Sequence, residues 1–418
     1  MNSSGSSPAP TSGQPAALPN LRHLALCCRV AREGSVSAAA RALHLTQPAV
    51  TQALQSVERE LGGPLFRREG GALVLTTEGS LACARLERAL DLLRRALAET
   101  RGWPKGRDAG DALHGCSAAQ LTALEQVVRH HGFALAARAV GVSRAGLNRH
   151  AHGLERATGA TLFEETSFGL MATREAEALA QAIGLARSEL AQARAELQGA
   201  APAAHAGRTV IGAMPLARSW LVPSAVLRFL ETTPGHTVEI LDGPYDTLLE
   251  ALRRGEADVL VGALRHPAPV DVLQEHLFDD PLAIVMRAGH PLAPGANQER
   301  PATAAQLARY AWVAPRTGSP LRAQYNALFQ AAGLPVPIGA VECNSWVAAR
   351  SLLLASDRLM LLSARQVHQE LEAGLLAVLP HPAGEVTRDI GLTLRHGWRP
   401  TASQASLLEE LRLSPRLR

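Results

Sequence analysis

Apolar residues between positions 21 and 61 recur with the period of an α-helix and predict three successive helices. The first begins at Leu21 and ends near Gly34, and a short alanine-rich helix follows over 37–45. The third spans 47–61, and its apolar residues fall on one face: Val50, Leu54, Val57 and Leu61. A glycine turn and a short apolar run over 72–76 then predict a β-hairpin, so this region is expected to form a winged helix-turn-helix.

The same pattern returns at a fixed distance of 97 residues. Between 36–66 and 133–163, nine of 31 positions are identical without a gap, where chance would give about two. A long amphipathic helix follows each repeat, with leucines or isoleucine at coiled-coil-like spacing: 86, 90, 93 and 97 in the first, and 179, 183, 190 and 197 in the second. The chain therefore carries a duplicated scaffold, whose two members are called copy 1 (21–99) and copy 2 (118–198).

After residue 207 the period changes, and short apolar strands alternate with helices, which predicts an α/β sheet. A first set of strands is expected over 209–213, 238–240, 258–264 and 282–288, and a second over 312–315, 340–343 and 359–363. A final strand over 389–395 and a helix over 402–412 return the chain to the first set. The pattern predicts a domain of two lobes.

Composition changes set the expected domain boundaries. We expect a disordered tail over 1–20, copy 1 over 21–99, a linker over 100–117, copy 2 over 118–198, a hinge over 199–207 and a two-lobed domain over 208–418. Lobe I is expected over 208–288 and 386–418, and lobe II over 289–385.

The exposed face of the 47–61 helix carries amides, hydroxyls and one cation, which can bond to base edges and phosphates in a DNA groove. The candidate DNA contacts of copy 1 are Ser35, Thr46, Gln47, Pro48, Thr51, Gln52, Gln55, Arg59, Arg67 and Arg68. Thr46 is also the expected N-cap of the helix, with Pro48 in its first turn. A polar helix face in isolation is usually only solvated, but the hairpin cations that follow favour DNA binding.

Copy 2 keeps the core positions but changes the outward ones. Its possible DNA contacts are Arg144, Asn148 and Arg149, with His152 and Arg156 on the same outward face. Arg67 and Arg68 become Glu164 and Glu165, whose charges would repel phosphate, so copy 1 is expected to be the better DNA reader. We also expect Arg41 to bridge Glu58, and Arg138 to bridge Glu155, in structural roles.

The residues of copy 1 resemble the N-terminal signature of the LysR-type transcriptional regulators. The matching elements are Gly34-Ser35, Ala39-Ala40, Thr46 to Ala49, Val57-Glu58, Leu61-Gly62 to Leu65-Phe66, and Leu75-Thr76 to Gly79. "GEADVLVGAL", "HPLA" and "MPLARSWLVPSAVLRFL" are similar to the effector domain of that family, and more loosely to its galactose-binding-protein-regulator branch. The resemblance covers about residues 20–412, with copy 2 as an insertion, and implies a periplasmic-binding-protein-like clamp.

A clamp of this kind binds its ligand between the lobes, at strand ends and helix N-termini. The candidate effector contacts lie on such loops: Pro215, Leu216, Arg218, Ser219, Tyr245, Ala263, Arg265, Arg316, Thr317, Ser319 and Ser345. The three arginines could each hold a carboxylate, although at least one is expected to be a surface ion pair. A small organic-acid or sugar-like effector fits these groups.

Other functions are disfavoured by what the sequence lacks. The N-terminus has no apolar signal segment and no run of about 18 apolar residues exists, so a cytoplasmic protein without a membrane partner is expected. The five cysteines have no zinc spacing and are expected to be reduced thiols, with no metal or cofactor. No metalloprotease, nucleophile-elbow or P-loop motif is present, so an enzyme is not expected. The alternative function is a solute-binding sensor that does not act primarily through DNA.

The expected partners are double-stranded DNA, a small-molecule effector, RNA polymerase and further copies of the chain in a dimer or tetramer. The net charge of +4 allows an anionic partner without proving one. In the resembled family, the linker helix dimerises two chains. Two arrangements are therefore open here: copies 1 and 2 pair with each other inside one chain, or each pairs with its counterpart in another chain.

Overall fold

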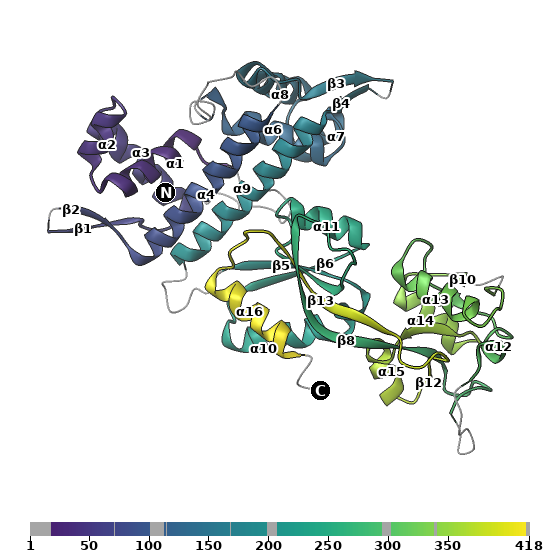
Figure 1. Cartoon of the computed structure of the whole chain (residues 1–418). Coiled ribbons are helices and arrows are strands. Elements are labelled where there is room, and N and C mark those ends of the chain that lie inside the picture. The colour runs from purple at the N-terminus through teal and green to yellow at the C-terminus, as the bar shows by residue number, and fades with distance from the viewer. Residues whose placement is uncertain are drawn as a thin grey trace, which may run out of the picture. The chain divides into compact units, whose positions relative to one another are not determined.

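The computed structural model describes residues 18–70, 72–100, 113, 115–167, 169–198, 207–294, 302–337 and 341–414. Most of the expected tail, linker and hinge lies outside these residues. The chain divides into two compact units, an N-terminal one with both copies and a C-terminal α/β one, and each is described by itself (Figure 1).

Copy 1 has the expected winged helix-turn-helix order. Its elements are α1 (Leu21–Glu33), α2 (Val36–Ala42), α3 (Gln47–Leu61), β1 (Phe66–Glu69), β2 (Ala72–Leu75) and α4 (Thr77–Glu99). Hydroxyl caps start three of the helices, because Ser35, Thr46 and Thr76 each accept a hydrogen bond from the amide three residues further on. Gly62 ends α3 with a φ of 85°, which a glycine adopts at little cost.

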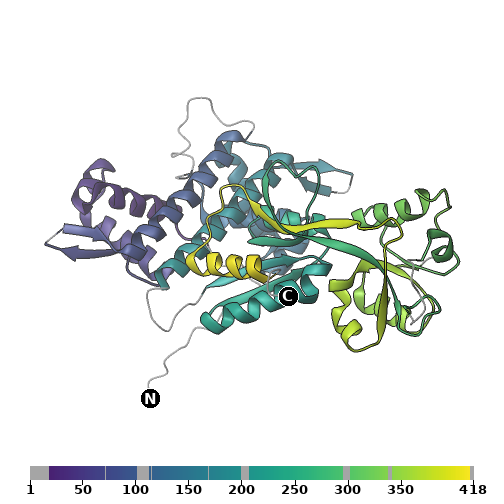
Figure 2. The same ribbon diagram turned by 60° about the horizontal axis from the view of Figure 1, so that its bottom comes forward.

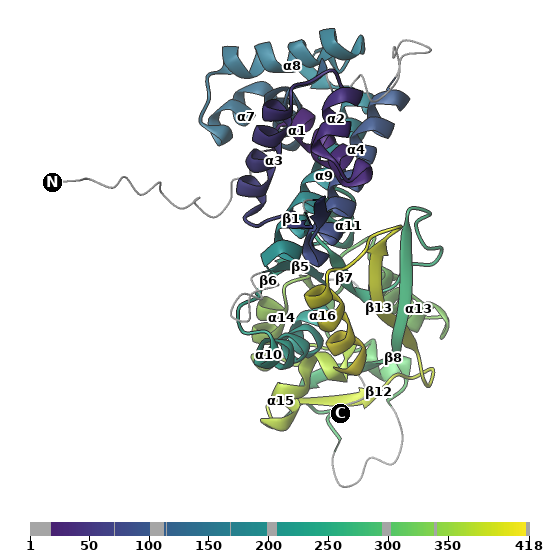
Figure 3. The ribbon, with the colours of Figure 1, turned by 90° about the vertical axis from the view of Figure 1, so that its left-hand side faces the viewer.

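Copy 2 repeats this order of elements. They are α6 (Ala118–Arg129), α7 (Phe133–Val140), α8 (Arg144–Thr158), β3 (Phe163–Thr166), β4 (Gly169–Ala172) and α9 (Arg174–Gln198). Both copies contribute to one continuous apolar core that extends from Leu18 to Leu197. The long helices α4 and α9 pack on each other, and α9 runs beside α4 in two views of the chain (Figures 1 and 3).

Lobe I of the C-terminal unit is built on a five-stranded mixed sheet with the order β8-β13-β7-β5-β6. Its strands are β5 (Arg208–Ala213), β6 (Thr237–Asp242), β7 (Val259–Ala263), the first part of β8 (Val272–Arg287) and β13 (Thr387–Arg395). β5 and β7 are parallel, whereas β13 is antiparallel to both of its neighbours. The helices are the π-helical turn η1 (Ala217–Leu221), α10 (Val222–Thr232), α11 (Tyr245–Arg253) and α16 (Ala402–Leu413), and α10 packs against α16.

Lobe II is built on the second part of β8, to which β11 (Met360–Ser363) and β12 (Leu376–Pro380) pair in antiparallel fashion. The short parallel strands β9 (Val313–Ala314) and β10 (Val341–Glu342) lie beside this group. Its helices are α12 (Ala304–Leu307), α13 (Pro320–Gln330), α14 (Trp346–Leu354), the 3-10 turn η2 (Ala364–Val367) and α15 (His368–Glu372).

β8 and β13 are the strands that connect the two lobes, and Figure 2 shows both as long strands, in green and yellow. β8 begins at Val272, so it is longer than the strand expected over 282–288. The first part of β8 was not predicted from the sequence, because polar residues such as His276, Asp279 and Asp280 interrupt the apolar run. Residues 282–286 of β8 pack in the cores of lobe II. The chain therefore passes from lobe I to lobe II before residue 288, the position at which lobe I was expected to end.

Candidate DNA interface and effector site

The outward face of α3 carries side chains that are exposed and available for a partner. Gln52, Gln55 and Arg59 are exposed, and none has a hydrogen bond or ion pair within the part of the chain that the structure describes. Gln47 lies one turn earlier, and its carbonyl accepts the Thr51 hydroxyl at 3.0 Å. The side-chain amides of Gln52 and Gln55 can each donate a hydrogen bond to a base edge and accept one from it. This is the chemistry required to read adenine in the major groove.

Two further candidates have structural duties at helix starts. Ser35 caps α2 through the Ala38 amide at 3.3 Å, and Thr46 caps α3 through the Ala49 amide at 3.4 Å. Pro48 lies in the first turn of α3, where a missing amide hydrogen costs nothing. Each capping oxygen keeps its own hydroxyl proton, which can still be donated to a phosphate.

The wing of copy 1 carries two cations at successive positions of β1, Arg67 and Arg68, and both are exposed. Arg67 forms an ion pair with Glu69 at 2.9 Å, while Arg68 has no partner among the described residues. An exposed pair of this kind contributes little to stability, so Arg67 can exchange Glu69 for a phosphate at small cost.

A glutamate stands at the same position of each copy, Glu58 in copy 1 and Glu155 in copy 2, and accepts hydrogen bonds from the backbone amides at the start of the wing. Glu58 Oε1 accepts the amides of Leu65 at 2.9 Å and Phe66 at 3.3 Å. Glu155 Oε1 accepts the amides of Leu162 at 2.8 Å and Phe163 at 3.1 Å.

The expected Arg41–Glu58 and Arg138–Glu155 bridges are absent from the described residues, so that prediction is wrong. Arg41 instead donates to the Ser37 carbonyl at 3.4 Å. The carboxylates are satisfied by backbone amides, because the unpaired amides where the chain enters the wing are nearer donors than an arginine on the short helix.

The outward face of α8 differs in both chemistry and availability. Arg144, Asn148 and Arg149 are exposed and have no partner among the described residues. His152, at the position of Gln55, is occupied: its ring lies 6.2 Å from Phe133 and 6.0 Å from Phe163, and Nδ1 is 2.5 Å from Glu155 Oε2. The ring and Nδ1 of His152 are therefore both engaged within copy 2.

The wing of copy 2 presents two carboxylates where copy 1 presents two guanidinium groups. Glu164 and Glu165 on β3 are exposed, and neither has a cationic partner among the described residues.

Helix α8 of copy 2 contains Gly146 and Gly153 where α3 of copy 1 has Ala49 and Ser56. Glycine in a helix costs about 1 kcal/mol relative to alanine, so α8 is the intrinsically weaker helix.

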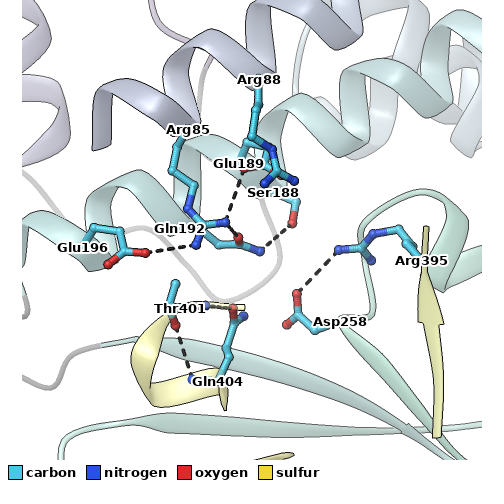
Figure 4. A network of polar contacts seen from close by, with 10 residues as sticks. All are labelled: Arg85, Arg88, Ser188, Glu189, Gln192, Glu196, Asp258, Arg395, Thr401 and Gln404. Carbon is cyan, nitrogen blue, oxygen red and sulfur yellow. Dashed lines mark hydrogen bonds and ion pairs between the residues drawn. The ribbon is translucent and has the colours of Figure 1, made fainter. Parts of the chain in front are cut away.

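The contact between α4 and α9 contains a buried charged cluster (Figure 4). Arg85 donates to Glu189 at 3.4 Å, to Glu196 at 3.0 Å and to the Gln192 side-chain oxygen, and its side chain is only 7% exposed. Arg88 donates to the other oxygen of Glu189 at 2.8 Å. The helices are antiparallel, since the earlier arginine meets the later glutamate. All the cations of the cluster belong to copy 1 and all the carboxylates to copy 2.

In lobe I, the candidate effector residues gather at the ends of β5 and β7 and the start of α11. Arg265 lies over the Tyr245 ring, 4.1 Å from its centroid, and burial lowers the pKa of this guanidinium from its usual value. Arg218 is paired with Asp242, so it is the surface ion pair that was expected among the three arginines. Ser219 donates to the Pro215 carbonyl at 3.1 Å, Leu216 is buried, and Ala263 ends β7.

In lobe II, the candidates lie at the N-termini of α13 and α14. Ser319 caps α13 through the Arg322 amide at 3.2 Å, and Ser345 caps α14 through the Ala348 amide at 3.5 Å. The Thr317 amide and hydroxyl both donate to Glu342, at 2.9 and 2.8 Å, and this lowers the pKa of that carboxyl. Arg316 is exposed, with no side-chain hydrogen bond or ion pair among the described residues.

A group of residues where the lobes meet was not predicted from the sequence. Asp280, which is fully buried, accepts the Ser363 hydroxyl at 2.5 Å and Arg388 at 2.6 Å. Arg365 on η2 lies 4.7 Å from the ring centroid of Phe278. The paired aspartates inside a strand, followed by a proline, were the available signal, but the partners of Asp280 are more than 80 residues away.

The five cysteines are free thiols, and four of them are buried. Burial raises the pKa of Cys28, and the contact with Cys83 together with burial raises that of Cys27. Both remain protonated thiols in the core, as expected.

These features define a class of protein: a DNA-binding regulator, in which winged helix-turn-helix modules precede a two-lobed ligand-binding domain. Family models agree with this class. The LysR substrate binding domain matches residues 202–414, and the bacterial regulatory helix-turn-helix of the lysR family matches residues 21–80 and again 118–177. The chain belongs to the LysR family of transcriptional regulators, which bind DNA and carry an effector-binding domain, and it is not an enzyme.

Two relatives differ informatively in length. The chain is 33% identical over 404 residues to the HTH-type transcriptional regulator GalR of Pseudomonas putida, an alignment that covers 94% of this chain and 97% of GalR. It is 29% identical over 295 residues to PcaQ of Agrobacterium fabrum, which covers 70% of this chain and 93% of PcaQ. GalR is therefore long enough for both copies, whereas PcaQ is shorter by about one copy.

A solved structure supports the fold. The chain resembles a full-length OxyR variant from Pseudomonas aeruginosa with a TM-score of 0.51 and 23% identity, over 72% of this chain and 94% of that one. Among the described residues, every helix is too short or too polar to cross a membrane.

Proposed function

We propose that copy 1 reads one half of an operator through α3, while copy 2 serves mainly as its partner. The observation that carries this proposal is the contrast between the free amides of Gln52 and Gln55 and the stacked ring of His152. The other contacts proposed for copy 1 are Ser35, Thr46, Gln47, Pro48, Thr51, Arg59, Arg67 and Arg68. Arg144, Asn148 and Arg149 are proposed as weaker phosphate contacts.

The pairing of copies 1 and 2 within one chain is supported by the charge pattern of α4 and α9. In a pair of two α4 helices, the places taken by Glu189 and Gln192 would hold Leu92 and Arg95, while the place of Glu196 would hold Glu99. Arg85 would then keep one carboxylate of the cluster but be buried near another cation. In a pair of two α9 helices, Glu189 would face Ala182 and Leu185 without any cation. The α4–α9 pair therefore joins more opposite charges than a pair of two α4 helices or a pair of two α9 helices would.

The reader assignment is tested by two matched double variants of the full chain. Footprinting across the genome first identifies operators, and binding is then measured at several salt concentrations. Gln52→Ala/Gln55→Ala should weaken specific binding by a hundred-fold or more, because each lost bidentate contact costs about 1–3 kcal/mol. Arg144→Ala/Arg149→Ala should cost about ten-fold or less and mainly reduce the salt slope. A larger loss for the arginine pair at equal salt would overturn the assignment.

The effector is proposed to be a small organic-acid or sugar-like molecule held between the lobes. Arg265 on Tyr245 supplies a desolvated cation in lobe I, and the exposed Arg316 with the N-termini of α13 and α14 supplies donors in lobe II. Pro215, Leu216, Arg218, Ser219, Ala263, Thr317, Ser319 and Ser345 complete the proposed site. Repeating the footprinting with candidate effectors, and with Arg265→Ala as the control, tests this assignment.

Oligomerisation, polymerase contact and a cytoplasmic location are further proposals. Leu227 on α10 and Ile240 on β6 are apolar but 67% and 44% exposed, which supports a dimer or tetramer formed through lobe I. RNA polymerase is the proposed partner when the regulator occupies a promoter. A regulator of transcription acts where the DNA is, which in a bacterium is the cytoplasm.

A further inference from the structure

Three side chains with metal-binding atoms gather on the surface of lobe I, across the neighbouring strands β8 and β13. His276 and Asp279 lie on β8 and Asp389 on β13, and one ligand atom from each lies within 4.8 Å of the others. The set combines one imidazole with two carboxylates.

A β-bulge brings two of these residues to the same face. In a regular strand, side chains three positions apart point to opposite faces. The register between β8 and β13 shifts at Ile390/Gly391: Phe278 pairs with Ile390, and His276 with Gly391, which leaves Leu277 as the extra residue. His276 and Asp279 are both exposed as a result, 2.9 Å apart between Nε2 and Oδ1.

The third residue adds a like charge at the closest cross-strand position. Asp389 pairs directly with Asp279, and carboxylates that face each other across two strands repel. Asp389 Oδ2 is 2.6 Å from Nε2 of His266, which lies just after β7. Each carboxylate is therefore next to an imidazole, and a shared cation between the two carboxylates would remove their repulsion.

We propose that His276, Asp279 and Asp389 bind one divalent transition-metal ion of the Zn²⁺ type, with His266 as a positioning residue for Asp389. Imidazole nitrogen and carboxylate oxygen are the ligands that such ions accept, at about 2.0–2.2 Å from the metal. Ligand atoms around a tetrahedral ion lie about 3.4 Å apart at these bond lengths, so exposed side chains within 4.8 Å close on the ion by small rotations. Three protein ligands leave a position for water.

A metal ion at this site would join strands next to the connection between the two lobes. Asp279 precedes Asp280, which holds Arg388 and Ser363 at the crossing between the lobes, and Asp389 follows Arg388. An ion bound here ties β8 to β13 and to the end of β7 next to the strands that connect the lobes. Metal binding is therefore expected to stabilise the C-terminal unit independently of DNA.

The test is calorimetric titration of the metal-free full chain with Zn²⁺ alone, repeated with variants. The native chain should bind one ion that is lost in His276→Gln/Asp389→Asn. Asp279→Asn alone should weaken binding by ten-fold or more, and His266→Gln by about ten-fold, as expected when a group that orients a ligand is removed. His150→Gln, which removes an exposed imidazole from α8, should leave this binding event unchanged.

Thermal unfolding of the same proteins supplies a second readout. Zn²⁺ should raise the unfolding temperature of the native chain and of His150→Gln, but not that of the double variant. Asp279→Asn keeps the proposal testable if the double variant fails to fold. Saturable binding that persists in Asp279→Asn at native affinity, or the absence of a one-to-one binding event in the native chain, would overturn the proposal.

Discussion

In copy 1 the outward face of α3 carries Gln52 and Gln55, whereas the equivalent positions of α8 carry Arg149 and His152. The positions that hold the fold show no such divergence: Glu58 and Glu155 accept the same two amides at the start of each wing. The two copies therefore share a scaffold and differ in their outward chemistry.

The linker helices show a second difference between the copies, and it is complementary. α4 supplies Arg85 and Arg88, and α9 supplies Glu189 and Glu196 to the same buried contact. Copy 2 thus has two features of a partner, a matched helix and an acidic wing, and lacks the free amides of a reader. This contrast supports our proposal that copies 1 and 2 pair with each other within one chain.

Among the variants that test this comparison, Arg85→Ala is expected to change the free energy of unfolding most. Removing the cation leaves two glutamates buried with less compensation, which should destabilise the N-terminal unit by about 3–5 kcal/mol. Arg95→Ala, an exposed cation on the same helix, should change stability by less than about 0.5 kcal/mol. Urea unfolding of the full chain measures both. Equal small effects would mean that the cluster does not hold the copies together.

A smaller effect is expected from Glu58→Ala in copy 1 and from Glu155→Ala in copy 2, where the variant also removes the partner of His152 Nδ1. Each variant leaves two wing amides without their carboxylate acceptor, at a cost of about 1–3 kcal/mol. Only Glu58→Ala should also weaken operator binding, because only the wing of copy 1 is proposed to contact DNA. Unfolding and operator titration of both variants separate the two properties. A matching loss of operator binding in Glu155→Ala would show that copy 2 reads DNA as well.

The smallest effect is expected from giving copy 2 a basic wing. Glu164→Arg/Glu165→Arg should increase non-specific DNA affinity and raise the salt slope by up to about 2, because each phosphate contact contributes about 0.9. Glu372→Arg/Glu385→Arg makes the same change of charge on exposed glutamates of lobe II and should alter the slope less. If the two variants behaved alike, the acidic wing would have no special role in keeping copy 2 off DNA.

Periodic features of the chain were predictable from the sequence. The bounds of α3, its apolar face and its Thr46 cap follow from local spacing, and the family signature extends the same reasoning to the class of protein. The family models and the similarity to GalR confirmed the predicted LysR fold and regulatory function.

Long-range partners were not predictable. Arg85 looks like a solvated cation in its own helix, because the glutamates that bury it are more than 100 residues away. His152 looks outward-facing until Phe133 and Phe163 are brought against it. The bulge that gathers His276 and Asp279 depends on the register with β13, which no local pattern reveals.

A disulfide between the copies tests most directly whether they pair within one chain. A Cβ added at Gly63 of copy 1 would lie 3.3 Å from the Cβ of Leu197 in α9, close to the spacing of about 3.5–4.5 Å found in disulfides. Gly63→Cys/Leu197→Cys in the full chain, oxidised and run on a denaturing gel without reductant, should give a cross-linked species of single-chain mass. A covalent dimer as the main product would contradict the account, because it would place the two copies of each pair on different chains.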